Sequence, residues 1–434
     1  MTAPAIVTGL DPAMPSTGAP EWPGARWVGA IDVRAIPATG RVPLRSAEGY
    51  LRARLLVREG AQVRGFVDVA IDDHAVDAPG LTHAAAALPE VERRVAHDGA
   101  AGTAPPITVV VCTRDRTAHL RLALTAILQL DYPDFDVVIV DNAPAGDETR
   151  QLIRSEFPDP RVRLVTEPRP GLSRARNTGL AVATGEFVAF TDDDVVVDRY
   201  WLAELAAGFS RAPGVDLVSG LVPSGELRTR VQGFFDDRVS WSKNLRGRLY
   251  SLTSPPPDLP MFPFSVGEYG TGANFAVRRS AATALGGFDT AFGVGTRTGG
   301  GEDLDMFTRV ILDGRSLVMQ PSALVWHRHR DDLAALRVQA RGYGIGLGAW
   351  LTKILLDPST ARIALVRAPH ALGRLLSLAW RTPEVSVVER TGGIDELDRT
   401  IARVGFLELF SVARGPFAYA RQRAAGEGTM RFPD

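Results

Sequence analysis

Three consecutive carboxylates, Asp192, Asp193 and Asp194, have the residue types and spacing best suited to chemistry in this sequence. They end the run FVAFTDDD, whose first residues are apolar enough for a strand buried on both faces. Adjacent carboxylates at the end of such a strand repel one another, and a bound cation relieves that repulsion. Oxygen ligands suit Mg²⁺ or Mn²⁺, which commonly bind substrate phosphates as well. The triplet predicts a metal-diphosphate site, with an acidic turn that caps the next helix as the alternative.

A second acidic pair, Glu302 and Asp303, follows three glycines at 299–301 and opens a predicted helix. Glycines let the backbone approach a ligand closely. A carboxylate placed there could accept a proton from a reacting hydroxyl group. Carboxylates are also favourable in the first turn of any helix, so a structural role for the pair stays open.

Two of the seven histidines, His327 and His329, lie in the segment VWHRHR. The residues before them form an apolar run that predicts a strand. Because they are two positions apart in an extended chain, both side chains point to the same side. Either imidazole can bind a metal ion or fill a structural position, and His327 directly follows the strand.

Strands and helices alternate in the predicted structure around the carboxylate triplet, which ends the fourth predicted strand. We predict strands at 107–113, 135–142, 161–167 and 186–194, and helices at 116–130, 147–157, 171–184 and 198–211. This order is typical of a parallel sheet with right-handed crossovers. Ligands bind outside the carboxyl ends of such strands. Thr113, Arg116 and Asp141 follow the first two strands, so we expect them near the triplet.

Five segments in this order resemble the family-2 glycosyltransferases, which have a GT-A fold. They are VVVCTRDR, VIVDN, LSRARNTGLAVATGEFVAFTDDD, GANFAVRRSAATALGGFD and GGGEDLDMFTRV. The resemblance covers residues 107–330, about half of the chain. Three positions depart from the common family pattern: Cys112 replaces a frequent Pro, Asp115 a frequent Asn, and Asn142 a frequent second Asp.

The resemblance implies a role for each matching residue. Asp141 would read the nucleobase, and Thr113 and Arg116 would contact base or ribose. The rest of the nucleotide-sugar site would comprise Arg176, Asn177, Asp192 and Asp193. Metal ligands would be Asp194, Asp192 and His327, holding Mn²⁺ or Mg²⁺. Asp303 would be the general base of an inverting transfer, with Glu302 assisting in acceptor binding.

The resemblance also implies the substrates. The donor would be a nucleotide-diphosphate sugar, and the acceptor a glycan, a lipid-linked glycan or a small metabolite. A sugar-1-phosphate nucleotidyltransferase is an alternative, but CTRDRTAHL lacks the glycine and lysine that its phosphate loop needs. A non-catalytic sugar-binding protein is a second alternative, and retention of both acidic motifs argues against it. A dehydrogenase is disfavoured because no GxGxxG follows the first strand.

Composition and charge limit the binding partners and the cellular locations that fit this sequence. The 434 residues carry a formal net charge of −1, so no basic field favours nucleic acid. Cys112 is the one cysteine, which excludes an intrachain disulfide. We expect no signal peptide and no transmembrane helix, since the best apolar window, 363–380, is interrupted by charge. These features favour a cytoplasmic protein.

The chain divides into four predicted parts. Residues 1–25 are expected to form a disordered tail, 26–100 a small β-rich module, 107–330 the GT-A domain and 331–434 a helical C-terminal region. Within the GT-A domain, residues 221–269 are expected to be an irregular loop. The helical region mixes apolar and arginine faces. The sequence leaves open whether it packs on the domain, binds a partner or contacts a membrane surface, and it leaves the oligomeric state open.

Overall fold

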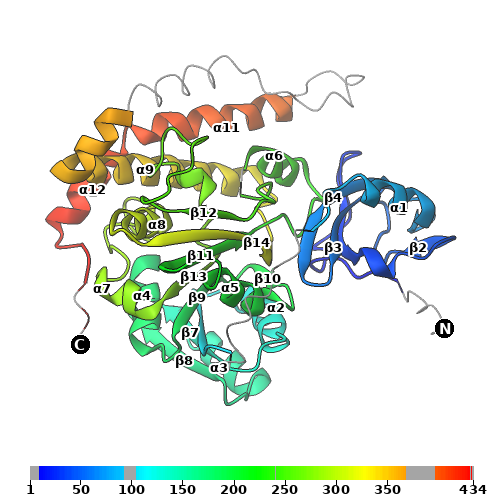
Figure 1. Cartoon of the computed structure of the whole chain (residues 1–434), viewed down its shortest axis with the longest axis horizontal. Helices are drawn as coiled ribbons and strands as arrows, with labels where there is room; N and C mark the ends of the chain where they lie inside the picture. The colour runs from blue at the N-terminus through cyan, green and yellow to red at the C-terminus, as the bar shows by residue number, and fades with distance from the viewer. Residues whose placement is uncertain (1–8, 92–103, 240, 368–395, 431, 433–434) are drawn as a thin grey trace.

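A computed structural model describes residues 9–91, 104–239, 241–367, 396–430 and 432. Figure 1 shows a central sheet with helices packed around it, a small β-rich module beside one edge, and a layer of C-terminal helices. The mixed α/β architecture predicted from the sequence is confirmed in this arrangement.

The central sheet of the described residues has nine strands. Its order is β10-β14-β11-β13-β9-β6-β7-β8, and β12 pairs with β14 outside this path. The strands are β6 (Ile107–Thr113), β7 (Phe135–Asn142), β8 (Val162–Glu167), β9 (Phe187–Asp192), β10 (Val195–Val197), β11 (Val215–Leu221), β12 (Arg248–Tyr250), β13 (Asn274–Arg278) and β14 (Ser316–His327). β6, β7, β8 and β9 are mutually parallel neighbours, as expected for the strand-helix alternation.

Helices cover both faces of this sheet, and valines of its central strand, β6, pack toward each face. Val110 of β6 packs in one cluster with residues of α4, α7 and α8. Val109 and Val111 pack in a second cluster with α2, α3 and α5. The helices of the domain are α2 (Thr117–Leu128), α3 (Glu148–Glu156), α4 (Leu172–Val182), α5 (Trp201–Phe209), α6 (Arg230–Arg238), α7 (Arg279–Ala284) and α8 (Glu302–Leu312).

Residues 221–269 contain more regular structure than the predicted irregular loop. Helix α6 begins with a capping box, in which Thr229 and Gln232 bond each other's backbone N–H groups. β12 then pairs antiparallel with β14. The Thr-x-x-Gln spacing is a signal for a helix start, and the sequence analysis did not use it.

The N-terminal module contains a three-stranded sheet of order β1-β3-β4, with a second two-stranded sheet of β2 and β5. Its elements are β1 (Trp27–Asp32), β2 (Arg41–Pro43), β3 (Arg52–Glu59), β4 (Gln62–Ala70), β5 (Ala75–Asp77) and α1 (Ala78–Ala86). Ion pairs join the module to the central domain: Arg54 contacts Asp236, and Arg58 contacts Asp198.

The prediction of a disordered tail is wrong for residues 9–25, while residues 1–8 lie outside the described residues. Leu10 and Pro12 form backbone bridges with Leu44 and Gly29. The Met14 side chain is 3% exposed and belongs to the core that lies against the central sheet. Proline-rich composition suggested disorder, but one buried methionine and several backbone bonds keep the segment in place.

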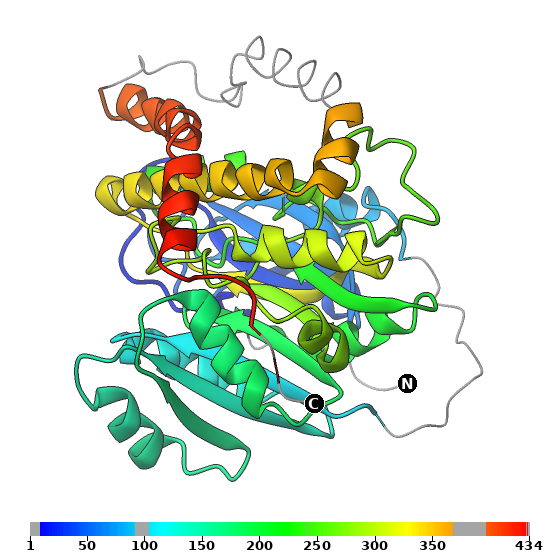
Figure 2. The same cartoon turned by 90° about the vertical axis from the view of Figure 1, so that its left-hand side faces the viewer.

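Three C-terminal helices lie along one side of the domain (Figure 2). They are α9 (Leu333–Leu356), α11 (Glu396–Val412) and α12 (Gly415–Ala424), and α9 contacts both of the others. No helix of the described chain is both long enough and apolar enough to cross a membrane. Most of the apolar window at 363–380, considered above for a transmembrane helix, lies outside the described residues.

Gly179 provides a test of how closely α4 packs on β6. A Cβ atom there would lie 2.4 Å from Cγ1 of Val110. Gly179→Ala adds helix propensity of about 1 kcal/mol, but overpacking costs about 1–3 kcal/mol. We expect a net loss of stability in urea unfolding. A double-mutant cycle with Val110→Ala should be strongly non-additive, because the smaller side chain makes room. Additive effects would contradict this packing.

Candidate functional site

The carboxylate triplet lies where β9 ends and β10 begins. Asp192 is the last residue of β9, and Asp193 and Asp194 form the turn before Val195. Asp193 and Asp194 are 3% and 6% exposed, whereas Asp192 is partly exposed. β9 is held between β6 and β13, so the triplet projects from the middle of the sheet.

Thr113 and Arg116 contact the triplet from the end of β6. The Thr113 hydroxyl donates to Oδ2 of Asp193 at 2.7 Å. The Arg116 guanidinium donates to Asp193 at 2.5 Å and to Asp194 at 2.9 Å. The structure thus joins both predicted residues to the triplet, and the single positive charge of the arginine is shared between two of its carboxylates.

His327 reaches the triplet from the end of β14. Its Nε2 lies 3.1 Å from Oδ1 of Asp194. One donor atom each from Asp192, Asp194 and His327 lie within 4.8 Å of one another. These are the three metal ligands predicted from the sequence. Two carboxylate oxygens and an imidazole nitrogen form a donor set that fits Mn²⁺, and Mg²⁺ through its oxygens.

The two buried aspartates have opposite pKa shifts. Burial, and then the neighbouring Asp194, raise the pKa of Asp193 to about 7. Burial also acts to raise the pKa of Asp194, but His327 and Arg116 outweigh it and hold that pKa well below its usual value. Burial acts to lower the pKa of His327, and Asp194 reverses this so that it rises overall. A proton or a cation between Asp194 and His327 therefore stabilises the cluster.

Arg176 of α4 connects the triplet to the second acidic pair. Its guanidinium, in a side chain only 3% exposed, lies 3.1 Å from Glu302 and 3.4 Å from Asp192. It also donates to the carbonyl of Gly272 at 2.9 Å. The first turn of α8 and the end of β9 therefore share one buried cation.

Glu302 and Asp303 differ sharply in their surroundings. Glu302 is buried, and burial followed by the charge of Asp303 raises its pKa to about 7. Asp303 is partly exposed and accepts a 2.8 Å hydrogen bond from the N–H of Gly272. A Cβ atom at Gly272 would lie 2.9 Å from the Arg176 guanidinium, so this close approach needs glycine. Of the pair, Asp303 is the carboxylate that a ligand can reach.

Asp141 lies beside Thr113 in the ladder between β6 and β7. It is 3% exposed and accepts a 3.3 Å hydrogen bond from Thr149. Burial raises its pKa. The neighbouring Asn142 has a structural role, because its amide bonds the backbone of Glu167, Arg169 and Gly171.

Asn177 does not join the cluster, although it follows Arg176 directly. Its amide oxygen accepts from the N–H of Phe288 at 2.7 Å, and its amide nitrogen donates to the Phe288 carbonyl at 2.8 Å. The side chain is 1% exposed. These two bonds fasten α4 to the segment after α7, which is a structural use of the amide.

His329 lies beside one of the three potential ligands, His327, rather than among them. Its Nδ1 lies 2.9 Å from Nδ1 of His327, and its side chain is buried against Phe235. Burial, and then His327, lower the pKa of His329 well below its ordinary value. A neutral His329 is placed to orient the ring of His327.

Arg330 contributes to the site, and the sequence analysis did not identify it. Its guanidinium lies 3.7 Å from Asp194. The alternation His-Arg-His-Arg from 327 to 330 gave no signal for this contact, because in an extended chain Arg330 would point away from His327. The strand β14 ends at His327, so the residues after it do not follow that rule.

Two hollows lie outside the carboxylate cluster. One, of about 490 Å³, is lined by Arg169, Arg174, Thr290, Arg423 and residues 425–430, and includes none of the carboxylates discussed here. The other, of about 150 Å³, lies between α6, α9 and α11. Its aromatic lining residues are Phe234, Phe235, Trp241 and Tyr343. Since Phe235 packs on His329, this aromatic hollow is one side chain away from the histidine pair.

The sequence is similar to those of known glycosyltransferases. Residues 108–282 match the sequence profile of Glycosyl transferase family 2. A pre-mycofactocin glycosyltransferase of Mycobacterium tuberculosis is 31% identical over 330 residues, which is 74% of this chain and 63% of that protein. The succinoglycan biosynthesis protein ExoM of Rhizobium meliloti is 28% identical over 259 residues, covering 57% of this chain and 71% of ExoM.

Among solved structures, the mannosyltransferase PcManGT of Pyrobaculum calidifontis, in complex with GDP-Man and Mn²⁺, aligns with a TM-score of 0.47 and 22% identity. That alignment covers 72% of this chain and 87% of PcManGT. The present chain spans less than two thirds of the length of the mycobacterial relative.

The contacts of Asn177 generate a prediction. Asn177→Ala leaves the N–H and carbonyl of buried Phe288 without their partners, at about 1–3 kcal/mol for each unsatisfied group. We expect a clear loss of unfolding free energy in urea. Nucleotide affinity, measured by calorimetry well below the midpoint of thermal unfolding, should stay unchanged. If the variant kept wild-type stability but no longer bound nucleotide, Asn177 would be a residue of the nucleotide-binding site.

Proposed function

Residues 108–282 form a Glycosyl transferase family 2 domain, and from this premise we propose that the chain is a metal-dependent inverting glycosyltransferase. It moves a sugar from a nucleotide-diphosphate sugar to an acceptor hydroxyl group. The observation that carries the proposal is the position of Arg176, whose one guanidinium contacts both Asp192 and Glu302. The triplet and the acidic pair therefore belong to one site rather than two.

The metal-binding part of the proposal rests on the donor set. Asp192, Asp194 and His327 would hold Mn²⁺ or Mg²⁺. A cation bound there neutralises negative charge on the diphosphate leaving group. Arg116, already paired with Asp193 and Asp194, prevents the carboxylates from repelling the donor. Thr113 and Asp141 lie side by side in the ladder at the nucleotide end of the proposed site.

The transfer step needs one base. The acceptor oxygen bonds to the anomeric carbon, the bond from that carbon to the diphosphate oxygen breaks, and the hydroxyl proton passes to Asp303. The nucleoside diphosphate leaves with the bonding electrons. The Gly272 N–H orients the Asp303 carboxylate, while the buried Glu302 holds Arg176 in place. A single displacement of this kind inverts the anomeric configuration.

The acceptor is proposed to have an apolar ring. The aromatic hollow of about 150 Å³ beside His329 has the volume of a site for one ring. The name of one relative supplies an acceptor to test, pre-mycofactocin, while ExoM, a succinoglycan biosynthesis protein, makes a glycan acceptor the alternative. A thermal-shift screen of nucleotide sugars with Mn²⁺, followed by these acceptors, would identify both substrates, because a bound ligand stabilises the native state.

Metal dependence is the first expected property. Excess EDTA should reduce transfer to background, and added Mn²⁺ or Mg²⁺ should restore it. Asp194→Ala and His327→Ala should both lose transfer while keeping the wild-type circular dichroism spectrum. Asp131→Asn is the control, because that carboxylate is largely exposed and pairs only weakly with Arg199. Full turnover in EDTA would exclude a metal-dependent mechanism.

The base is tested by Asp303→Asn, which keeps the size of the side chain but cannot accept the proton. Turnover at saturating substrates should fall by roughly 10²–10⁴, with little change in the dissociation constant of the donor. NMR of the product should show an inverted anomeric centre. If donor affinity fell and turnover at saturation persisted, Asp303 would be a binding residue, and Glu302 would be the next candidate. A retained anomeric configuration would exclude the single displacement.

A further inference from the structure

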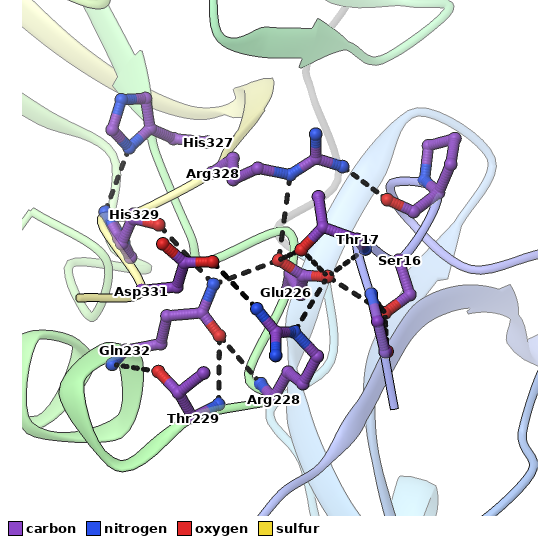
Figure 3. A network of polar contacts seen from close by, with 12 residues as sticks. Ser16, Thr17, Glu226, Arg228, Thr229, Gln232, His327, Arg328, His329 and Asp331 are labelled. Carbon is purple, nitrogen blue, oxygen red and sulfur yellow. Dashed lines mark hydrogen bonds and ion pairs between the residues drawn. The ribbon is translucent and has the colours of Figure 1, made fainter. Parts of the chain in front are cut away.

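A buried polar network connects the N-terminal segment to the chain that carries His327 (Figure 3). Its centre is Glu226, which lies between β11 and α6 and is 4% exposed. None of the roles proposed above uses this carboxylate. It contacts both the N-terminal segment and residues 327–331.

The backbone around His327 is tied to two other parts of the site. The His327 N–H donates to the carbonyl of Pro223 at 3.0 Å, and the His327 carbonyl accepts from Gly225 at 2.8 Å. The next N–H, of Arg328, donates to the carbonyl of Asp194 at 3.1 Å. Residues 223–225, which hold the backbone of His327 in position, therefore lead directly to Glu226.

Side chains beyond His327 are fastened to the same region. The carbonyl of His329 accepts from Gln232 at 3.4 Å, and that amide also donates to Glu226 at 3.0 Å. The Arg328 guanidinium lies 3.7 Å from Glu226. Asp331 pairs with Arg228 at 2.7 Å. Three of the four residues that follow His327 are thus held by the cluster around Glu226.

The N-terminal segment completes the coordination of Glu226. Oε1 accepts from the Ser16 hydroxyl at 2.9 Å and from the Thr17 N–H at 2.8 Å. The carbonyl of Pro15 accepts a hydrogen bond from Arg328. Met14 packs so closely on Gly225 that a Cβ atom there would lie 2.4 Å from the methionine sulfur. The segment therefore contacts Glu226, Gly225 and Arg328, all of which lie close to His327.

Glu226 is present as a carboxylate in this network. Burial acts to raise its pKa, but the Thr17 N–H, the Gln232 amide and the other donors lower that pKa overall. A buried carboxylate is stable only while such partners remain. Loss of its charge would release the Ser16–Thr17 segment and Gln232 together.

We propose that Glu226 is a positioning residue for His327, and that residues 15–17 are part of the active-site frame. The network keeps the segment after β14 in the position where the His327 ring faces Asp194. This inference rests on the proposed metal-dependent function. It assigns a role in the active site to the N-terminal segment, which lies outside the sequence motifs of the catalytic domain.

The test is direct binding of Mn²⁺ to the full chain, followed by the EPR signal of the free ion, with a saturating nucleoside diphosphate present. Glu226→Gln should raise the Mn²⁺ dissociation constant by about 10-fold, in the range for groups that orient metal ligands. Ser16→Ala, on the exposed side of the network, should raise it by a smaller factor in the same direction. Turnover of Glu226→Gln should recover largely at high Mn²⁺.

Asp198→Asn is the matched control. Asp198 also joins the N-terminal module to the domain through a mostly buried ion pair, with Arg58 at 2.5 Å, but it has no contact with residues 327–331. We expect it to lower the thermal midpoint while leaving the Mn²⁺ dissociation constant unchanged. Equal effects of Asp198→Asn and Glu226→Gln on metal affinity would show that docking of the module alone is responsible, which would overturn the proposal.

The remaining outcomes separate this inference from the proposed function. A wild-type chain that bound no Mn²⁺ with any nucleotide would contradict the metal-dependent function itself. Wild-type binding together with unchanged binding by folded Glu226→Gln would contradict only the role of Glu226. If Glu226→Gln does not fold, Ser16→Ala decides: unchanged Mn²⁺ affinity in that variant would overturn the role of the N-terminal segment.

Discussion

Repulsion among three adjacent carboxylates is the constraint on which this structure depends. Two of them are buried, and their opposite pKa shifts show that the turn cannot carry three full charges without compensation. The compensating cations come from three separate parts of the fold. Arg116 lies just before α2, and Arg176 lies on α4. His327 ends β14, and Arg330 follows it. Secondary-structure elements that are distant in sequence must therefore meet at the carboxylate triplet.

The strand order satisfies this requirement. β14 pairs antiparallel with β10, and the register sets His327 opposite Val195, the residue after the triplet. A shift of one residue would turn the His327 side chain to the other face of the sheet. The backbone bond from Arg328 to Asp194 and the pairing of Gly225 with His327 both act against such a shift. Register, rather than the identity of the histidine alone, brings the three donor atoms together.

Local pattern was enough to predict the parallel strands, because β6, β7 and β9 are short runs that are mostly apolar and buried. The edge strand β8 is only partly buried. β6 and β7 have the bounds expected from the sequence. Sequence pattern did not predict ordered structure where that structure depends on residues distant in sequence. Residues 9–25 look disordered by composition, yet Ser16 and Thr17 are held by Glu226, more than 200 positions away. Helix geometry explains why Asn177 has different surroundings from its neighbour Arg176. Successive residues point about 100° apart, so Arg176 faces the carboxylates while Asn177 faces Phe288.

The difference between Glu302 and Asp303 follows from the same helical geometry. Both open α8, where the N-terminal end of the helix favours negative charge. Their side chains point in different directions, so Glu302 turns inward to Arg176 and Asp303 outward to the N–H of Gly272. A buried carboxylate paired with a guanidinium is suited to holding a frame, because moving it would expose an unpaired charge. A partly exposed carboxylate with one backbone donor keeps lone pairs available for a substrate proton. Adjacent positions with nearly identical chemistry can therefore have different burial and different partners, and the distinct tasks proposed for Glu302 and Asp303 rest on that difference.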